Sequence, residues 1–176
     1  MKRLPIAFFA RDATVVAPAL LNKRLVAEGC AGRIVEVEAY TADDPASHSF
    51  RGRTARNDVM FGPPGRLYVY FTYGMHHCAN VTTGCDGDGQ AVLLRAALPL
   101  EGVEVMRARR HDRPDRLLAN GPGKLAEAFA FGLGHNGRLA EIYDDGTPPP
   151  ADPLVGPRIG ITRAADWRRR YRVPPT

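Results

Sequence analysis

The stretch RLYVYFTYGMHHCANVTTG, residues 66–84, decides the fold. Its aromatic and β-branched residues favour two strands, 67–72 and 76–83, because such side chains pack well on a pleated surface. The two strands are joined by a turn around Tyr73-Gly74-Met75. We therefore predict a β-hairpin with this tyrosine projecting from its tip.

A second strand pattern precedes the hairpin in RIVEVEAY, residues 33–40. Polar and apolar residues alternate there, which predicts that the even-numbered side chains, with Ile34 among them, share one face and that the odd-numbered ones form an apolar face. Glu38 and Tyr40 then lie on the same face at the strand's end, directly before an irregular polar loop that carries His48. Catalytic groups are common at such places, because a rigid strand holds them while the loop shapes a pocket.

Helical and turn patterns surround these strands. Asp12 is the expected N-cap of a helix that runs to Leu21, with Pro18 marking a kink or an early stop. The other expected elements are strands at 24–27, 90–97 and 158–162, helices at 102–110 and 123–131, turns at 61–65 and 84–89, a proline-rich linker at 146–157 and one helical turn at 164–167. Strands that follow one another closely can pair antiparallel.

Composition narrows the class of protein. The 176 residues suffice for one domain with a single core. Lys and Arg total 24 against 19 Asp and Glu, and the net charge of +5 favours a polyanionic partner such as nucleic acid, or an anionic membrane surface. No apolar run approaches the roughly 18 residues that a membrane helix needs, and the first residues lack the apolar core of a secretory signal. We therefore expect a soluble, intracellular (cytoplasmic) protein.

The cysteines do not suggest a framework or a metal centre. Cys30, Cys78 and Cys85 are odd in number and have no C-x-x-C spacing, which argues against both disulfides and a zinc knuckle. In His76-His77-Cys78 only the first and last residues share a strand face, whereas zinc takes three or four ligands. We expect reduced, structural cysteines, no metal and no cofactor.

Ordinary explanations stay open when the residues are considered alone. Glu38 suits a solvent-facing strand position, His48 suits a core histidine, and Tyr68 and Tyr70 suit the packing of a sheet. A large aromatic on a protruding turn, such as Tyr73, can instead enter a DNA stack as a wedge.

Several motifs occur in a fixed order: IVEVEAY at 34–40, Ser47-His48-Ser49, RLYVYFTYGMHHCANV at 66–81, AVLLRA at 91–96, LEG at 100–102 and GPGKL at 121–125. In this order they resemble the alkyladenine (3-methyladenine) DNA glycosylase family, over about residues 20–167. An ordered set is far more specific than any single motif. Patterns and resemblance together predict one α+β domain over residues 1–176, with a mainly antiparallel curved sheet, flanking helices and a protruding β-hairpin.

The resemblance implies a catalytic role for two residues. Glu38 matches the carboxylate that polarises the attacking water, and Arg95 matches an arginine that helps to hold this water. Tyr40, His48 and Tyr70 match the groups between which the flipped base lies.

Other residues are implied to select the base and to bind the DNA. Asn80 matches the residue that opposes the exocyclic amino group of normal guanine, Ala39 belongs with the base-binding residues, and Tyr73 matches the wedge left in the vacated stack. The expected DNA-backbone contacts are Lys124 at a helix start, Arg51, Arg53, Arg56 and the run Arg168-Arg169-Arg170.

The implied chemistry needs few groups. Sugar hydrolysis generally uses two carboxylates, but alkylation at N3 or N7 makes the purine cationic, so the leaving group is already activated. We expect a monofunctional enzyme of base excision repair, acting as a monomer on double-stranded DNA. It releases 3-methyladenine, 7-methylguanine and, with a further acid, hypoxanthine or ethenoadenine, without strand cleavage.

Two alternatives remain at this point: a noncatalytic damage-recognition module, which needs the wedge but not the pairing of Glu38 with Arg95, and an RNA-binding β-domain. The tail WRRRYRVPPT aligns with the family only across a gap. The backbone carbonyl that helps to bind the water is expected near Val173.

Overall fold

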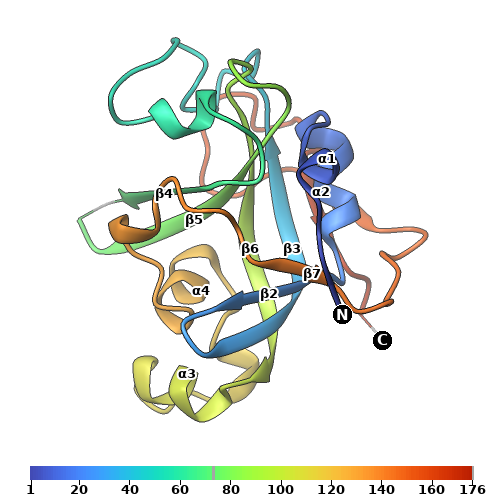
Figure 1. Ribbon diagram of the computed structural model, residues 1–176, viewed down its shortest axis with the longest axis vertical. Coiled ribbons are helices and arrows are strands. Elements are labelled where there is room, and N and C mark those ends of the chain that lie inside the picture. The colour runs from blue at the N-terminus through green and yellow to red at the C-terminus, as the bar shows by residue number, and fades with distance from the viewer. Residues whose placement is uncertain (73, 176) are drawn as a thin grey trace.

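Two long strands, β3 (Cys30–Tyr40) and β6 (Gln90–Glu101), pair antiparallel along the axis of the fold (Figure 1). The coordinates are a computed structural model that describes residues 1–72 and 74–175. Over these residues, nine strands form one sheet in the order β1-β7-β2-β3-β6-β5-β4, and β9 pairs with β3 and β8. The remaining strands are β1 (Lys2–Arg3), β2 (Arg24–Ala27), β4 (Leu67–Thr72), β5 (His76–Thr83), β7 (Ile142–Asp144), β8 (Leu154–Gly156) and β9 (Arg170–Arg172). All of their pairings are antiparallel, which confirms the predicted sheet.

The predicted hairpin is β4 and β5, which extend to one side of the long strands (Figure 1). Tyr68 pairs with Asn80 in its register, and β5 continues the sheet by pairing with β6. Tyr73, the predicted wedge, lies outside the described residues. The two strands of the hairpin therefore form as predicted, and β5 joins them to the rest of the sheet through β6.

Strand β3 departs from strict alternation. Its register with β6 shifts on both sides of Glu36. The shift places Ile34 in the same buried core as Val37 and Ala39, so the prediction that Ile34 faces the same side as Glu38 and Tyr40 is wrong. A β-bulge adds a residue to one strand and turns the side chains beyond it to the other face, which a count of alternating residues cannot detect.

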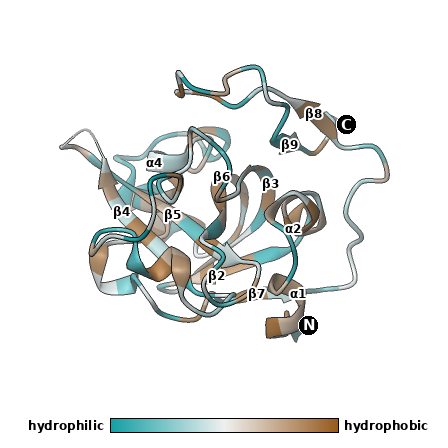
Figure 2. Cartoon of the chain, turned by 90° about the horizontal axis from the view of Figure 1, so that it is seen from above, coloured by the Kyte–Doolittle hydropathy of each residue, from teal (hydrophilic) through white to brown (hydrophobic). Residues whose placement is uncertain are grey.

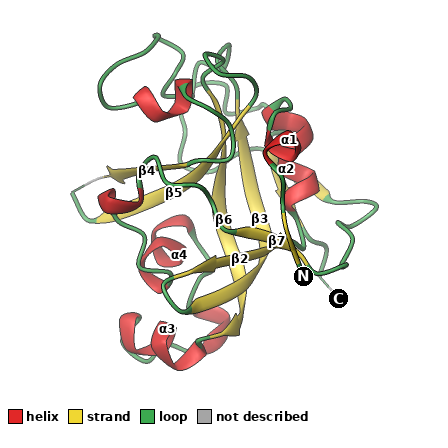
Figure 3. Ribbon diagram, in the orientation of Figure 1, coloured by secondary structure: helices red, strands yellow, loops and turns green. Residues whose placement is uncertain are grey.

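Helices cover the sheet on two sides (Figure 3). In the described chain these are α1 (Ile6–Phe9), α2 (Ala13–Leu20), α3 (Val103–Arg109) and α4 (Pro122–Ala128), with short 3-10 turns at Asp58–Phe61, Asp115–Leu117 and Leu133–His135. The Asp12 side chain accepts the backbone N–H of Thr14 at 2.8 Å, which confirms the predicted N-cap. Helix α4 ends earlier than predicted, because Ala130 adopts a left-handed φ of 52°.

The main core lies where α2 and α4 pack on the sheet. Helix α2 contacts β3 and β6, and α4 contacts β5 and β6. Leu20, Leu94 and Phe129 are fully buried there. Apolar stretches follow the strands and helices, whereas many of the connecting loops are hydrophilic (Figure 2). Among the described residues, no helix is long and apolar enough to cross a membrane.

The C-terminal segment differs from the prediction. The expected strand at 158–162 is wrong: this stretch is irregular, and strands form instead on either side of it, at Leu154–Gly156 and Arg170–Arg172. The predicted proline-rich linker accordingly ends in β8. The expected helical turn at 164–167 is a hydrogen-bonded turn, from Trp167 N–H to the Ala164 carbonyl at 3.1 Å. Within this stretch the backbone N–H of Ile159 bonds to a side chain instead of to a strand, as described below.

Gly102, the last residue of the LEG motif, joins β6 to α3 in a conformation that favours glycine. Its φ is +68°, and an added Cβ would overlap the carbonyl oxygen of Gly29 and approach the Cys30 Sγ to 3.0 Å. The β6–α3 connection therefore depends on a residue without a side chain.

We expect Gly102→Ala to lower the free energy of unfolding in urea by more than Gly146→Ala does. Gly146 also has a positive φ, +92°, but open space surrounds it within the described chain. The control should lose about 1–2 kcal/mol, the cost of a left-handed alanine, and Gly102→Ala should lose more, because the overlap adds to this strain. Equal losses would contradict the tight approach to Gly29.

Candidate active site

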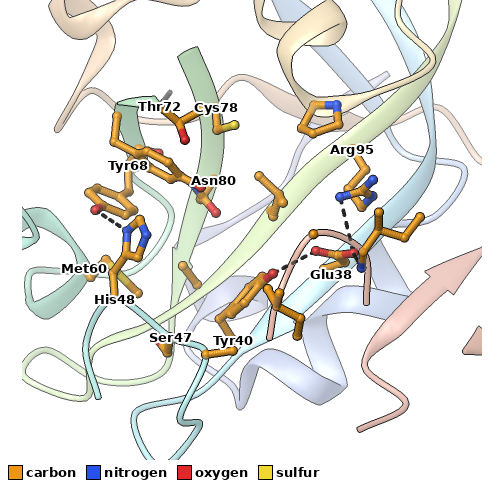
Figure 4. Close-up of a pocket in the computed structure, with 18 of the residues that line it drawn as sticks. Glu38, Tyr40, Ser47, His48, Met60, Tyr68, Thr72, Cys78, Asn80 and Arg95 are labelled. Atoms are coloured by element: carbon orange, nitrogen blue, oxygen red, sulfur yellow. Dashed lines mark hydrogen bonds and ion pairs between the residues drawn. The ribbon is translucent and has the colours of Figure 1, made fainter. Parts of the chain in front are cut away.

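A cavity of about 340 Å³ opens at the end of β3, between the sheet and the loop that follows it (Figure 4). Strands β4, β5 and β6 form its floor, and residues 159–161 of the C-terminal segment close one side. Its size falls in the range of small-molecule sites. The predicted residues that line it are Glu38, Tyr40, His48, Arg56, Tyr70, Asn80 and Arg95.

Glu38 lies at one end of the cavity with its side chain fully buried. Its Oε1 accepts the backbone N–H of Ile159 at 2.9 Å and lies 3.3 Å from Nη1 of Arg95. Its Oε2 accepts the hydroxyl of Tyr40 at 2.8 Å. The solvent-facing alternative for Glu38 is therefore wrong. An ionised carboxylate can be buried here, because a cation and two neutral donors replace its hydration.

Arg95 is held between two carboxylates. Its Nε donates to Oε1 of Glu36 at 2.9 Å, while its Nη1 points to Glu38. Arg170, on β9, lies 3.3 Å from the same Glu36 oxygen. The register shift in the β3–β6 pairing falls at Arg95, and bulges of this kind re-aim side chains near active sites. Two carboxylates and two guanidinium groups thus balance in charge around the end of the cavity.

Tyr40 is a neutral hydrogen-bond donor. Burial, and then the charge and hydrogen bond of Glu38, raise the pKa of its phenol far above the ordinary value. The guanidinium of Arg158 lies over its ring, 4.6 Å from the centroid. The hydroxyl therefore stays protonated and donates a hydrogen bond to Glu38.

His48, Tyr68 and Tyr70 form the opposite wall. The His48 ring meets the Tyr70 ring edge-on, with centroids 4.6 Å apart, and its Nδ1 lies 2.9 Å from the Tyr68 hydroxyl. Figure 4 shows His48 and Tyr68 across the cavity from Tyr40 and Glu38. Burial raises the pKa of Tyr68 to about 12 and that of Tyr70 further. Both sides of the cavity are thus aromatic.

Asn80 lies in the floor of the cavity and is nearly fully buried. Its Nδ2 donates to the Tyr68 carbonyl at 3.0 Å across the β4–β5 ladder. This bond fixes the position of the amide group, so that the Asn80 side chain continues to occupy part of the cavity.

The remaining predicted residues lie outside this wall or at its edge. The Ala39 side chain points into the main core, and only its carbonyl faces the site, where it accepts Arg158 at 3.1 Å. Arg51 and Arg56 line a second cavity of about 430 Å³ that shares His48 and Tyr68 with the first. Their neighbours in its wall include Arg163.

Two other predicted phosphate contacts have protein partners. Arg53 is exposed and pairs with Asp58 at 2.6 Å. Lys124 is exposed in the first turn of α4, 3.0 Å from Asn120, and the neighbouring Pro122 lines the cavity. Both cations can exchange these surface partners for phosphate at little cost.

The sequence interpretation missed the segment 158–161. Ile159 donates its N–H to Glu38, and Arg158 holds the loop after β3. The predicted strand at 158–162 gave no indication of either contact. Val173, where a water-binding carbonyl was expected, donates its N–H to Val35 and packs on the main core. In the structure it is Ile159, and not Val173, whose backbone contacts Glu38.

Within residues 1–72 and 74–175, no three His, Cys, Asp or Glu side chains gather as metal ligands. The Sγ of Cys78 lines the cavity as a buried thiol, and burial raises its pKa. Glu38 thus brings a buried carboxylate to the cavity, paired with the guanidinium of Arg95.

Comparison with known proteins shows the family of the chain. The family model described as methylpurine-DNA glycosylase (MPG) matches residues 7–175. The chain belongs to this family. The glycosylase is 55% identical to "Putative 3-methyladenine DNA glycosylase" of Burkholderia lata, over 97% of this chain and 87% of the relative. Proteins with the same name from Carboxydothermus hydrogenoformans and Methanoculleus marisnigri are 45% and 46% identical, each over 96% of this chain and 93% of its own length.

The family confirms the resemblance predicted from the ordered motifs, and it identifies an enzyme of DNA repair that acts on alkylated purines. The alternatives of a noncatalytic module and an RNA-binding domain are therefore wrong for this glycosylase. Damaged DNA is its substrate as a member of this family.

We expect His48 to be neutral at pH 7. Burial, and then the charge of Arg56, lower its pKa below the ordinary value of about 6.5. The unfolded chain then binds the proton more readily, so the stability of the glycosylase should fall as the pH drops below about 6.5 and should not change through this group above it. NMR titration of the imidazole resonances, assigned with His48→Gln, measures the pKa, and a midpoint at or above 6.5 would contradict the burial.

Proposed function

We propose that the glycosylase flips an alkylated purine from duplex DNA into the cavity and hydrolyses its N-glycosidic bond with a water activated by Glu38. The observation that carries the proposal is the buried carboxylate of Glu38, paired with Arg95 at the end of an aromatic cavity. A flipped nucleotide would bring its sugar to this end.

The hydrogen bonds of Glu38 leave room for one water. An ionised carboxylate offers about four acceptor sites. One site on Oε1 is taken by Ile159 and one on Oε2 by Tyr40, while Nη1 of Arg95 forms an ion pair with Oε1 at 3.3 Å. The attacking water would use the remaining site on Oε2, give its proton to Glu38 and bond to the anomeric carbon of the sugar. The electron pair of the broken bond returns to the purine, which loses its positive charge on leaving.

The walls suit a cationic base. Tyrosine rings attract a cation through their electron-rich faces. Tyr40 and Tyr70 stay protonated, and a neutral His48 does not repel an alkylated purine. This supports 3-methyladenine and 7-methylguanine as substrates. Hypoxanthine and ethenoadenine are neutral, so their release needs an acid that protonates the leaving base.

DNA binding would use the basic surface around the cavity. Arg51, Arg53, Arg56 and Lys124 would contact phosphates, and Tyr73 would enter the vacated stack. Duplex DNA as the substrate in turn implies an intracellular enzyme.

We expect Glu38→Gln to abolish base release and to leave DNA binding intact. Glutamine keeps the volume and one acceptor oxygen but cannot take a proton, so the single-turnover rate on a duplex with 7-methylguanine should fall at least about 100-fold. Glu101→Gln, which changes an exposed carboxylate paired with Arg24, serves as the matched control and should be unaffected. Wild-type release by Glu38→Gln would remove this carboxylate from the mechanism.

Asn80 should exclude normal guanine. Because its amide is fixed to the Tyr68 carbonyl, it cannot swing away from an exocyclic amino group. Asn80→Ser should therefore increase the release of guanine from undamaged duplex while 7-methylguanine release persists. Chromatography of the freed bases measures the ratio, and an unchanged ratio would show that another group rejects guanine.

A further inference from the structure

Arg158 and Asp44 form a fully buried ion pair beside the cavity. Both side chains are 0% exposed, with Nη2 3.0 Å from Oδ1 and Nη1 in contact with Oδ2. Asp44 stands in the loop after β3 and Arg158 follows β8, so the pair joins segments 114 residues apart. A buried ion pair is often no more stabilising than apolar residues of the same volume. Stability alone therefore does not explain its presence here.

The same guanidinium fixes Tyr40 in two ways. Its Cζ lies 4.6 Å from the centre of the Tyr40 ring, and its Nη1 donates to the carbonyl of Ala39 at 3.1 Å. A planar guanidinium can stack on a ring and donate in its own plane at once, which a lysine ammonium cannot do. The Tyr40 hydroxyl, 2.8 Å from Oε2 of Glu38, is positioned by both contacts.

Arg158 also affects the other oxygen of Glu38 through the chain itself. The next residue, Ile159, donates its N–H to Oε1 at 2.9 Å. Because the Arg158 side chain is clamped on Asp44, the backbone that continues into Ile159 has little freedom. Both of these hydrogen-bond donors to Glu38, Tyr40 and Ile159, thus depend on one arginine.

We propose that Arg158 is a positioning residue for base release: clamped by Asp44, it holds the Tyr40 hydroxyl and the Ile159 N–H on the two oxygens of Glu38. The inference rests on the proposed role of Glu38. Arg158 fixes the direction of the free acceptor site on Oε2, and hence the place of the water. Small displacements of reacting groups cost rate rather than affinity.

Arg158→Lys tests this role, because it keeps the charge opposite Asp44 but loses the planar group on Tyr40. The single-turnover release of 7-methylguanine at saturating protein should fall by about tenfold or more, and the dissociation constant for the duplex should not change. Urea unfolding and circular dichroism confirm that the variant is folded.

Arg33→Lys is the matched control. Arg33 also makes a two-oxygen contact with an aspartate, Asp145, and donates to a backbone carbonyl, that of Asn22, at the far end of β3. It should lose stability and keep the rate. Equal rates in the Arg158→Lys and Arg33→Lys variants would overturn the proposal.

A double-mutant cycle with Tyr40→Phe tests whether the two residues are coupled in the rate of base release. A purely structural role of Arg158 would not produce such coupling. Without the hydroxyl, Arg158→Lys should cost much less rate than in the wild type, because both changes disturb the same donor. Fully additive losses would overturn the proposal.

Two further variants keep the outcomes distinct. If Arg158→Lys does not fold, Asp44→Asn, which keeps an Oδ1 acceptor for the Ala46 N–H, should show the same loss of rate, and a wild-type rate would overturn the inference. If Glu38→Gln is inactive while Arg158→Lys is normal, only this inference fails. If Glu38→Gln is active, the proposed function fails.

Discussion

A fully buried carboxylate, that of Glu38, is the constraint on which the rest of the site depends. Removing a charged group from water is unfavourable unless cations and hydrogen-bond donors replace its hydration. Here the replacement comes from Arg95 on β6, Tyr40 on the same strand and Ile159 in the C-terminal segment. Three parts of the chain must therefore converge on one group.

This requirement explains features that otherwise look irregular. The register shifts around Glu36 let β3 pack Ile34 and Val37 in the core and still bury Glu38 in the cavity. The stretch after β8 is not a strand, and its Ile159 N–H bonds to the Glu38 carboxylate. Regular secondary structure is interrupted where the carboxylate has its partners, as is common at functional sites.

The sequence predicts those parts of the molecule that local patterns determine. The β4–β5 hairpin, the Asp12 cap and the adjacency of Glu38 and Tyr40 follow from residues that are neighbours in the chain. The bulge in β3 arises in its pairing with β6, and the contact of Ile159 with Glu38 joins residues 121 apart in the chain. Alternation carries no information about either. Arg95 could be placed in the site only through the resemblance, since an arginine in an apolar strand has many explanations.

The late position of Arg158 and Ile159 in the chain has a consequence for biosynthesis. A ribosome makes the glycosylase from its N-terminus, so Glu38, Tyr40 and Arg95 leave it well before the donors that complete their surroundings. Until residues 158 and 159 are made, the carboxylate of Glu38 lacks the Ile159 N–H, and the ring of Tyr40 lacks the guanidinium that lies over it. The donors around the carboxylate are therefore complete only when residues 158 and 159 have been added to the chain.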